Sequence, residues 1–286
     1  MQADEIWGGR HMLVSEESVP MVDEGPPAAA TGTGASGVTV SVRGVTRQYR
    51  SGLIALAGAA VEIGTGEMVA LVGPSGCGKS TLLKIIAGLL SATEGDVRFG
   101  GGGRGSDGRP EIGYVFQDPH LLPWRRTLRN VELFLEVDGM NKSERRRRAR
   151  EALALVGLPD FERAFPAELS GGMKMRVSLA RTLATDPQLM LFDEPFAAVD
   201  EITRHRLNND LIRLQRDRHV TGIFVTHSIM ESVFLADRVA VMSPGPGRIV
   251  DVVDVPFGDD RPASLRTTPE FAEIARRIGE IMGVEA

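Results

Sequence analysis

A glycine-rich loop in the first third of the chain has the residue types of a phosphate-binding site. It reads GPSGCGKST and follows the pattern G-x-x-x-x-G-K-[ST] between an apolar strand-like segment and a helical one. The glycines would let backbone N–H groups close around phosphates, Lys79 would neutralise the β- and γ-phosphates, and Ser80 would offer its hydroxyl to Mg²⁺. Cys77 is expected to be a small loop residue and not a nucleophile. The candidate residues are Gly73, Pro74, Ser75, Gly76, Cys77, Gly78, Lys79, Ser80 and Thr81.

Carboxylate, imidazole and amide side chains follow apolar segments elsewhere in the chain. Asp193 and Glu194 end the segment LMLFDE, whereas His227 follows GIFVT and Gln117 follows GYVF. Ligands of open α/β sheets bind beyond the carboxyl ends of the strands, so these side chains are candidates for one site. Asp193 and Gln117 suit the Mg²⁺ shell. Glu194 suits a base for water, and His227 suits a hydrogen bond to the γ-phosphate. The alternative is structural, with Asp193 as a cap and His227 as an ordinary structural histidine.

The segment LSGGM has the pattern of a second anion site. Ser170 can cap a helix, and the free N–H groups of Gly171, Gly172 and Met173 would then point at whatever precedes that helix. A plain capped helix is the alternative. Because this segment lies in an insert separate from the core, we expect the phosphate loop that it serves to belong to a second copy of the chain.

The elements that must position these residues alternate between strand and helix patterns, which indicates an α/β fold. A stretch without strand signals, from about 119 to 186, predicts a helical insert with helix starts at Thr127, Ser143 and Ser170 and a stop at Gly157. The expected strands are 38–45, 59–63, 67–73, 95–99, 188–193, 222–226, 238–242 and 248–255, with a short one before Gln117. Outside the insert, helices are expected over 79–90, over 201–218 and from about 269.

Composition excludes some classes of protein. The net charge of −5 counts against nucleic-acid binding, which usually needs a basic excess. A single cysteine fits a reducing compartment, and no apolar run is long enough to span a bilayer. We therefore expect a cytoplasmic protein that reaches a membrane only through a partner or a lipid surface.

Two segments have an unusual composition. Residues 1–37 have the composition of a linker. The arginine cluster at 144–148 is expected to be a solvated face, with a docking surface for acidic groups as the alternative.

The order of these motifs over about residues 38–255 resembles the nucleotide-binding subunit of ABC transporters. The resemblance implies an α/β fold with a P-loop NTPase core, an antiparallel β subdomain and an inserted α-helical signature subdomain, followed by a helical tail over 256–286. It also implies two ATP molecules held between two subunits in a head-to-tail dimer. Each ATP would contact one phosphate loop and, from the other subunit, Ser170 and Gly172.

The resemblance implies further roles for single residues. Tyr49 in TRQYRSG would stack on adenine, and Asp200 in AAVD would cross the dimer interface. Glu194 would be the catalytic base, His227 the switch residue, and Gln117 a link from the metal site to the membrane partner. The signature departs from the usual LSGGQ at Met173, and further departures are Met175 and Ala197. Backbone amides survive all three changes, so hydrolysis is expected to persist.

A narrower similarity, in HLLPWRRTLRNV, DEPFAAVDEITR and SPGPGRIV, is to importers of nitrate, aliphatic sulfonates, taurine and bicarbonate. It implies a separate permease, a solute-binding protein, and a location on the cytoplasmic face of the plasma membrane. The permease would contact Leu121, Leu122, Pro123 and Trp124, and a buried core aromatic is the alternative for Trp124. Two alternative functions are a DNA-repair or translation ATPase, and a binding module that uses ATP only to dimerise. A DNA-repair or translation ATPase of this kind needs long coiled coils or two cassettes in one chain, and the sequence shows neither. Intact Lys79, Asp193 and Glu194 argue against a module that only binds ATP.

Overall fold

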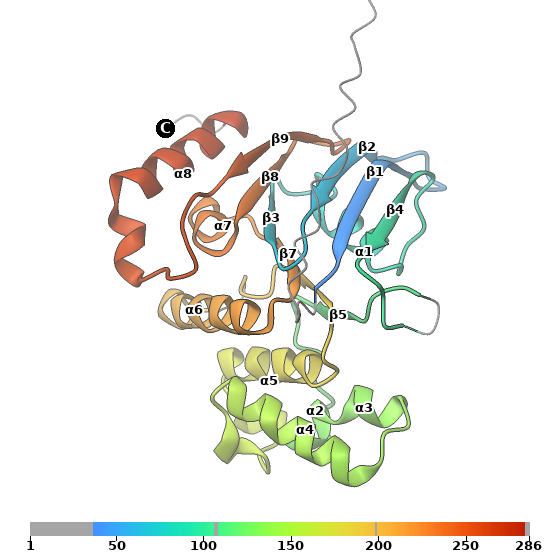
Figure 1. Ribbon diagram of the computed structural model, residues 1–286, viewed down its shortest axis with the longest axis vertical. Helices are drawn as coiled ribbons and strands as arrows, with labels where there is room; N and C mark the ends of the chain where they lie inside the picture. Colours follow the sequence, from blue (N-terminus) through green and yellow to red (C-terminus); the bar gives the residue numbers. More distant parts are fainter. Residues whose placement is uncertain (1–36, 106–107, 198, 284–286) are drawn as a thin grey trace, which may run out of the picture. The chain divides into compact units, whose positions relative to one another are not determined.

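Two β-sheets form the framework of the computed structural model, which describes residues 37–105, 108–197 and 199–283. A three-stranded antiparallel sheet has the order β2-β1-β4, and a six-stranded sheet has the order β5-β6-β7-β3-β8-β9, in which only the edge strand β9 runs antiparallel to its neighbour (Figure 1). The strands are β1 Thr39–Gln48, β2 Ile54–Ile63, β3 Met68–Val72, β4 Glu94–Gly100, β5 Ile112–Val115, β6 Leu189–Asp193, β7 Thr221–Val225, β8 Arg238–Met242 and β9 Ile249–Asp254.

Alternate side chains of the central strands enter two different apolar cores, as the two-residue period of a strand requires. In β3, Val69 and Leu71 pack with α1 and the three-stranded sheet, whereas Met68 and Ala70 pack on the other face. All five residues of β3 and of β7 are buried, which explains why these strands read as continuous apolar runs. The central strands therefore hold the loops at their carboxyl ends on a rigid base.

Helices cover both faces of the larger sheet and form the separate insert. The helices are α1 Lys79–Ile86, α2 Thr127–Val131, α3 Leu133–Val137, α4 Lys142–Leu155, α5 Gly171–Leu183, α6 Glu201–Arg218, α7 Ile229–Leu235 and α8 Pro269–Ile281, with 3₁₀ turns at Pro159–Phe161, Pro166–Glu168 and Ala263–Thr267. No strand lies between positions 119 and 186 of the described chain, as the sequence predicts. None of the helices in the described ranges is long and apolar enough to cross a membrane.

Three expectations about the helices were wrong or incomplete. The helix expected over 79–90 ends at Ile86, because Gly88 adopts φ +74° and Leu89 is exposed. Ser143 does not cap α4; the Asn141 side chain accepts the Glu144 N–H at 3.0 Å and does so instead. Helix α7 was not expected, because seven residues are too few for a helical period to stand out. The segment of linker composition, residues 1–37, lies almost wholly outside the described residues.

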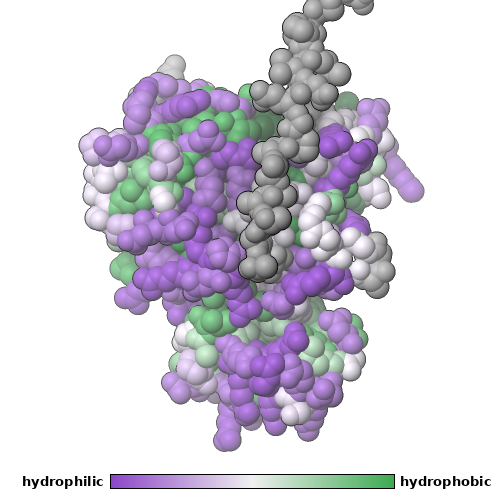
Figure 2. Space-filling view, viewed as in Figure 1, coloured by the Kyte–Doolittle hydropathy of each residue, from purple (hydrophilic) through white to green (hydrophobic). Residues whose placement is uncertain are grey.

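The arginine cluster of α4 is mostly a solvated face, as expected, with one exception. Hydrophilic side chains gather over α4 at the bottom of the view in Figure 2. Arg147 pairs with Glu144 and Glu151, one helical turn away in each direction. Arg145 differs, because its side chain is only 12% exposed and its Nε lies 3.6 Å from the buried carboxylate of Glu132.

Glu132 holds the helical insert together from inside. Its side chain is 1% exposed and accepts a 2.6 Å hydrogen bond from Arg129, with Arg145 and Arg146 within 4 Å. Breaking a buried pair by removing one partner commonly costs about 3–5 kcal/mol. Glu132→Gln is therefore expected to lower the free energy of unfolding by about 3 kcal/mol, measured by denaturant titration.

The control for this substitution is Glu151→Gln. The pair of Glu151 with Arg147 is 56% exposed on both sides, so its loss is expected to cost less than about 1 kcal/mol. Equal effects of the two substitutions would contradict a structural role for the buried carboxylate.

Candidate nucleotide-binding site

The glycine-rich loop lies between β3 and α1, where the sequence predicts it. Gly76 and Gly78 have φ values of +77° and +101°, a region that disfavours side chains. A Cβ on Gly78 would also lie 2.7 Å from the Ala55 carbonyl oxygen, whereas one on Gly76 would meet nothing within 4 Å. Gly78 therefore packs the loop against β2, and Gly76 leaves its open side accessible to a ligand.

Lys79 points into this loop. Its Nζ donates to the carbonyl oxygens of Gly73 at 2.8 Å and Pro74 at 3.0 Å, and the residue is 5% exposed. Cys77 is also buried, with its Sγ 3.9 Å from Nζ, as expected for a loop residue that packs inward. The loop thus concentrates a positive charge among backbone amides, which is the chemistry that a phosphate group requires.

Ser80 and Asp193, both predicted ligands of Mg²⁺, meet at the end of β6. The Ser80 hydroxyl donates to Asp193 Oδ1 at 2.6 Å. Mg²⁺ prefers hard oxygen ligands and is usually held by one or two protein groups together with water and substrate phosphates. The described residues contain no cluster of three or more His, Cys, Asp or Glu that could hold a metal alone. A hydroxyl and one carboxylate beside a phosphate loop therefore fit a magnesium–nucleotide complex.

Tyr114 is a member of this site that the sequence did not reveal. Its hydroxyl donates to Asp193 Oδ2 at 2.9 Å. Burial, and then the neighbouring carboxylate, raises the pKa of the Tyr114 hydroxyl above its usual value, so this group stays protonated. Asp193 is therefore oriented from both sides, with Oδ1 toward Ser80 and Oδ2 toward Tyr114. No pattern in the sequence pointed to Tyr114, because 79 residues separate the two partners.

Glu194 and His227 face each other across the ends of β6 and β7. Glu194 has φ +49°, an uncommon conformation for a residue with a side chain, and its amide donates to the Val225 carbonyl oxygen at 3.1 Å. His227 Nδ1 lies 3.6 Å from Glu194 Oε2. The His227 side chain is 60% exposed, so it is not a buried core histidine. The two side chains are near enough to bind the same small group.

A cleft of about 410 Å³ joins the predicted residues on this side of the fold. Tyr49 forms one edge, with its hydroxyl 3.5 Å from Thr81 Oγ1 and the Arg47 guanidinium 5.0 Å from the centre of its ring. Leu53 and Ala55 were not expected in this site. The cleft is lined by Tyr49, Leu53, Ala55, Ser75, Gly76, Gly78, Lys79, Ser80, Thr81 and Glu194.

The signature residues do not line this cleft. Ser170 caps α5 as expected, accepting the Met173 N–H at 3.3 Å, and a Cβ on Gly171 would meet nothing within 4 Å. A Cβ on Gly172 would lie 2.6 Å from Thr203 Cγ2, so this glycine also permits close packing of α5 on α6. Thus Ser170 and Gly171 present an open helix N-terminus away from the cleft of their own chain.

Two other predicted residues also lie outside the cleft. Asp200 is exposed and caps α6 by accepting the Thr203 N–H at 3.0 Å, a bond that lowers the pKa of the Asp200 carboxyl. Gln117 is exposed in the loop after β5. Neither position is buried, so both remain candidates for contacts with other molecules.

The segment proposed to meet a permease is largely at the surface. Trp124 is 71% exposed, so the alternative of a buried core aromatic is wrong. Pro123 is exposed as well, whereas Leu121 and Leu122 are half-buried and Leu121 packs on the larger core. An exposed tryptophan beside anchored leucines is the pattern of a contact surface.

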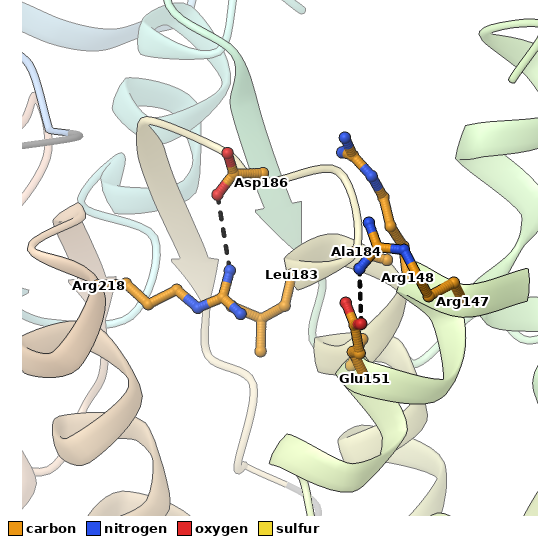
Figure 3. A pocket seen from close by; sticks show the side chains of 8 residues that line it. Arg147, Arg148, Glu151, Leu183, Ala184, Asp186 and Arg218 are labelled. Atoms are coloured by element: carbon orange, nitrogen blue, oxygen red, sulfur yellow. Dashed lines mark hydrogen bonds and ion pairs between the residues drawn. The ribbon is translucent and has the colours of Figure 1, made fainter. Parts of the chain in front are cut away.

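A second hollow, of about 190 Å³, lies between α4 and the ends of α5 and α6. Figure 3 shows that Arg147 turns toward Glu151 and that Arg218 turns toward Asp186. Because acidic neighbours already pair with these arginines, the hollow has little of the free positive charge that a phosphate site needs.

The chain resembles known proteins over most of its length. The family model described as ABC transporter matches residues 56–197. The uncharacterised ABC transporter ATP-binding protein MJ0412 of Methanocaldococcus jannaschii is 46% identical over 225 residues, covering 78% of this chain and 82% of the relative. The taurine import ATP-binding protein TauB of Yersinia pestis is 42% identical over 249 residues, covering 83% and 94%.

A solved structure supports the same assignment. The dimeric, post-hydrolysis ATP-binding cassette MJ0796, bound to ADP and Pi, has a TM-score of 0.66 and 34% identity, and covers 77% of this chain and 100% of its own. The TM-score shows that this cassette and the chain share a fold. The chain therefore belongs to the ABC transporter family, as an ATP-binding subunit that couples ATP hydrolysis to transport.

Proposed function

We propose that this ATPase energises the import of a small anion-like nutrient, namely taurine, another aliphatic sulfonate, nitrate or bicarbonate, through a separate permease. The names of relatives at 42–45% identity, which are taurine import ATP-binding proteins, support the importer and favour the sulfonates. They also argue against the alternative of an ATPase that acts on nucleic acids or in translation. The observation that carries the hydrolytic role is the pairing of Glu194 with His227 beside the phosphate loop.

In this proposal each residue of the cleft has a separate task. The loop amides and Lys79 bind the phosphates, while Tyr49 contacts the adenine. Ser80 and Asp193 would hold Mg²⁺, with Gln117 as a further ligand, and the ion would neutralise the charge that develops on the phosphates. Tyr114 keeps Asp193 in the orientation that this requires.

Glu194 is proposed to take a proton from the attacking water. Its carboxylate reaches the cleft because the left-handed turn after Asp193 directs the two adjacent side chains to different positions. His227 is proposed to hold the γ-phosphate and to orient Glu194, from which it is 3.6 Å away. The protein thus supplies a base and a positioned imidazole on two neighbouring strands.

A second copy of the chain is proposed to complete each site. Ser170 and Gly171 leave an open helix N-terminus, which together with the adjacent Gly172 is a suitable site for the γ-phosphate held by the partner. Asp200 would cross the same interface. The dimeric structure of MJ0796 supports this arrangement.

Growth of a strain that lacks this gene tests the nutrient class. We expect poor growth on taurine or an aliphatic sulfonate as sole sulfur source, and normal growth on nitrate as sole nitrogen source. The wild-type gene should restore growth, and the Glu194→Gln variant should not. A defect on nitrate alone would move the assignment to that anion, and normal growth in both media would contradict both assignments.

The same assay tests the permease surface. Trp124→Ala is expected to fail in complementation although the purified chain still hydrolyses ATP, because an exposed aromatic anchor commonly contributes about 2 kcal/mol or more to an interface. Phe161→Ala, which removes another partly exposed aromatic of the insert, is the matched control and should restore growth. Full complementation by Trp124→Ala would show that the permease binds elsewhere.

A further inference from the structure

The last described segment of the chain packs on the helix that follows His227. Helix α7 begins at Ile229, two residues after His227. Phe271 and Ile278 of α8 are fully buried in the core that also contains Val233 and Phe234 of α7. Figure 1 shows α8 on the same side of the larger sheet as α7. The C-terminal segment therefore forms part of the support of α7.

The start of α7 fixes the residues on both sides of His227. Thr226 donates to the buried carboxylate of Glu231 at 2.6 Å and accepts the Ser228 N–H at 3.0 Å. The Ser228 side chain caps α7 by accepting the Glu231 N–H at 3.2 Å. Because Thr226 and Ser228 are both bound to the first turn of the helix, any movement of α7 carries His227 with it.

The end of α7 is held by a single arginine of the C-terminal segment. Arg261 Nη1 donates to the carbonyl oxygens of Phe234 and Ala236, each at 2.8 Å, which are groups that a helix end leaves without intrahelical partners. Its Nη2 donates to the carbonyl oxygen of Phe257 at 3.1 Å. The guanidinium is fully buried, and burial lowers the pKa of Arg261 to about 10. Arg261 therefore joins α7 to the chain that leads into α8.

Arg261 also reaches the strand that carries the phosphate loop. Its Nη2 lies 3.3 Å from Asp237 Oδ1, and Asp237 Oδ2 accepts the Met68 N–H at 2.8 Å, at the start of β3. Arg216, in the last turn of α6, pairs with Asp237 as well. Through Asp237 the arginine thus connects the end of α7 with α6 and with β3, and the other end of β3 leads into the phosphate loop.

A second arginine of the segment contacts the side chain of Phe234, whose carbonyl oxygen binds Arg261. The Arg266 guanidinium is 3.3 Å from the centre of the Phe234 ring. Its Nη2 and the Oε1 of Glu231 are both buried without a hydrogen-bond partner among the described residues. The C-terminal segment therefore places positive charge near the carboxylate that binds Thr226.

We propose that residues 256–283 are a positioning element for His227, with Arg261 as the residue through which it acts. Arg261 fixes the end of α7, and α7 in turn fixes Thr226, His227 and Ser228 opposite Glu194. This inference rests on the proposed role of His227 in hydrolysis. Its structural part, the coupling of Arg261 to α7, is testable without any ATPase activity.

Arg261→Lys is the variant that separates positioning from folding. A lysine keeps the charge and most of the length, but it lacks the planar fork that reaches the α7 carbonyls, Phe257 and Asp237 together. We expect kcat for ATP to fall about 10-fold with KM little changed, because misplacement of a reacting group by about 1 Å can cost up to about 100-fold. Arg276→Ala in α8, which removes only exposed ion pairs, is the control and should retain wild-type kcat.

A double-mutant cycle shows whether the effect passes through His227. If it does, Arg261→Lys should lower kcat in the wild-type background and have no further effect in a His227→Ala background. Equal effects in the two backgrounds would mean that Arg261 acts on the fold in general. Arg266→Met removes the guanidinium that contacts Phe234 of the same helix. It should also lower kcat, but by less than Arg261→Lys does.

Amide hydrogen exchange on the full-length chain measures the coupling of Arg261 to α7 without relying on ATPase activity. With Arg261→Lys, exchange should become at least about 10-fold faster in Thr226–Leu235 as well as in residues 256–283, because the end of α7 loses its hydrogen bonds. Faster exchange in 256–283 with α7 unchanged would overturn the proposal. If His227→Ala hydrolyses ATP normally, the proposed role of His227 in hydrolysis fails, and the exchange result still decides whether this segment holds α7.

Discussion

Glu194→Gln is expected to reduce ATP turnover about 10²–10⁴-fold, the usual cost of losing a general base. Glutamine has the same shape as glutamate, so the turn at the end of β6 and the approach of His227 should persist. The amide cannot accept a proton from water, and hydrolysis should stop after ATP has bound. The measurement is the release of phosphate at saturating ATP, with a binding assay that confirms an unchanged affinity for nucleotide.

Glu270→Gln is the control for this variant. The same change in an exposed glutamate of α8 should leave turnover within about twofold of wild type, as is usual for surface substitutions. Turnover of Glu194→Gln at the wild-type rate would remove Glu194 from the mechanism. A loss of nucleotide binding in this variant would indicate instead that Glu194 helps to form the cleft.

Mixing two inactive variants is expected to restore activity. Lys79→Ala removes the charge of the phosphate loop, and Ser170→Arg places a long cation at the open N-terminus of α5, so each homodimer should be inactive. A mixed dimer retains one site with an intact Lys79 and, from the other chain, an intact Ser170. With random pairing, an equal mixture should recover roughly a quarter of wild-type turnover.

The cap that Ser170 provides needs a control of its own. Losing a helix N-cap costs about 1 kcal/mol, which could inactivate the chain by unfolding the insert. Asn141→Arg removes the cap of α4 in the same way, and this variant alone should hydrolyse ATP normally. If equal mixtures of Lys79→Ala and Ser170→Arg never regain turnover while Asn141→Arg is active, the shared site is contradicted.

The parts of the site that could be predicted are those that short segments specify. The loop from Gly73 to Thr81 has its shape because glycines allow it, and Ser170 caps α5 through a residue three positions away. The helix over 201–218 also has the bounds that the sequence predicts, because Asp200 caps its start and polar periodicity continues to Arg218. Local chemistry was sufficient in each of these cases.

The contacts that could not be predicted join residues far apart in the chain. Tyr114 donates to Asp193, and Arg261 binds the end of α7 some 25 residues earlier. No periodicity or spacing specifies such pairs, because packing of several elements decides them. Trp124 illustrates the opposite difficulty: an aromatic residue suits both a core and a contact surface, and only the fold shows that it is exposed.

Neither chain is expected to complete its ATP site alone. The molar mass of the Glu194→Gln variant in the presence of ATP and Mg²⁺ tests this most directly. Light scattering of the wild-type monomer without nucleotide should give a value near 30.8 kDa. With ATP, the variant should give about twice that mass, because ATP that is bound and not hydrolysed links two subunits. A variant that binds ATP and Mg²⁺ yet stays at the mass of one chain at every concentration would contradict the claim.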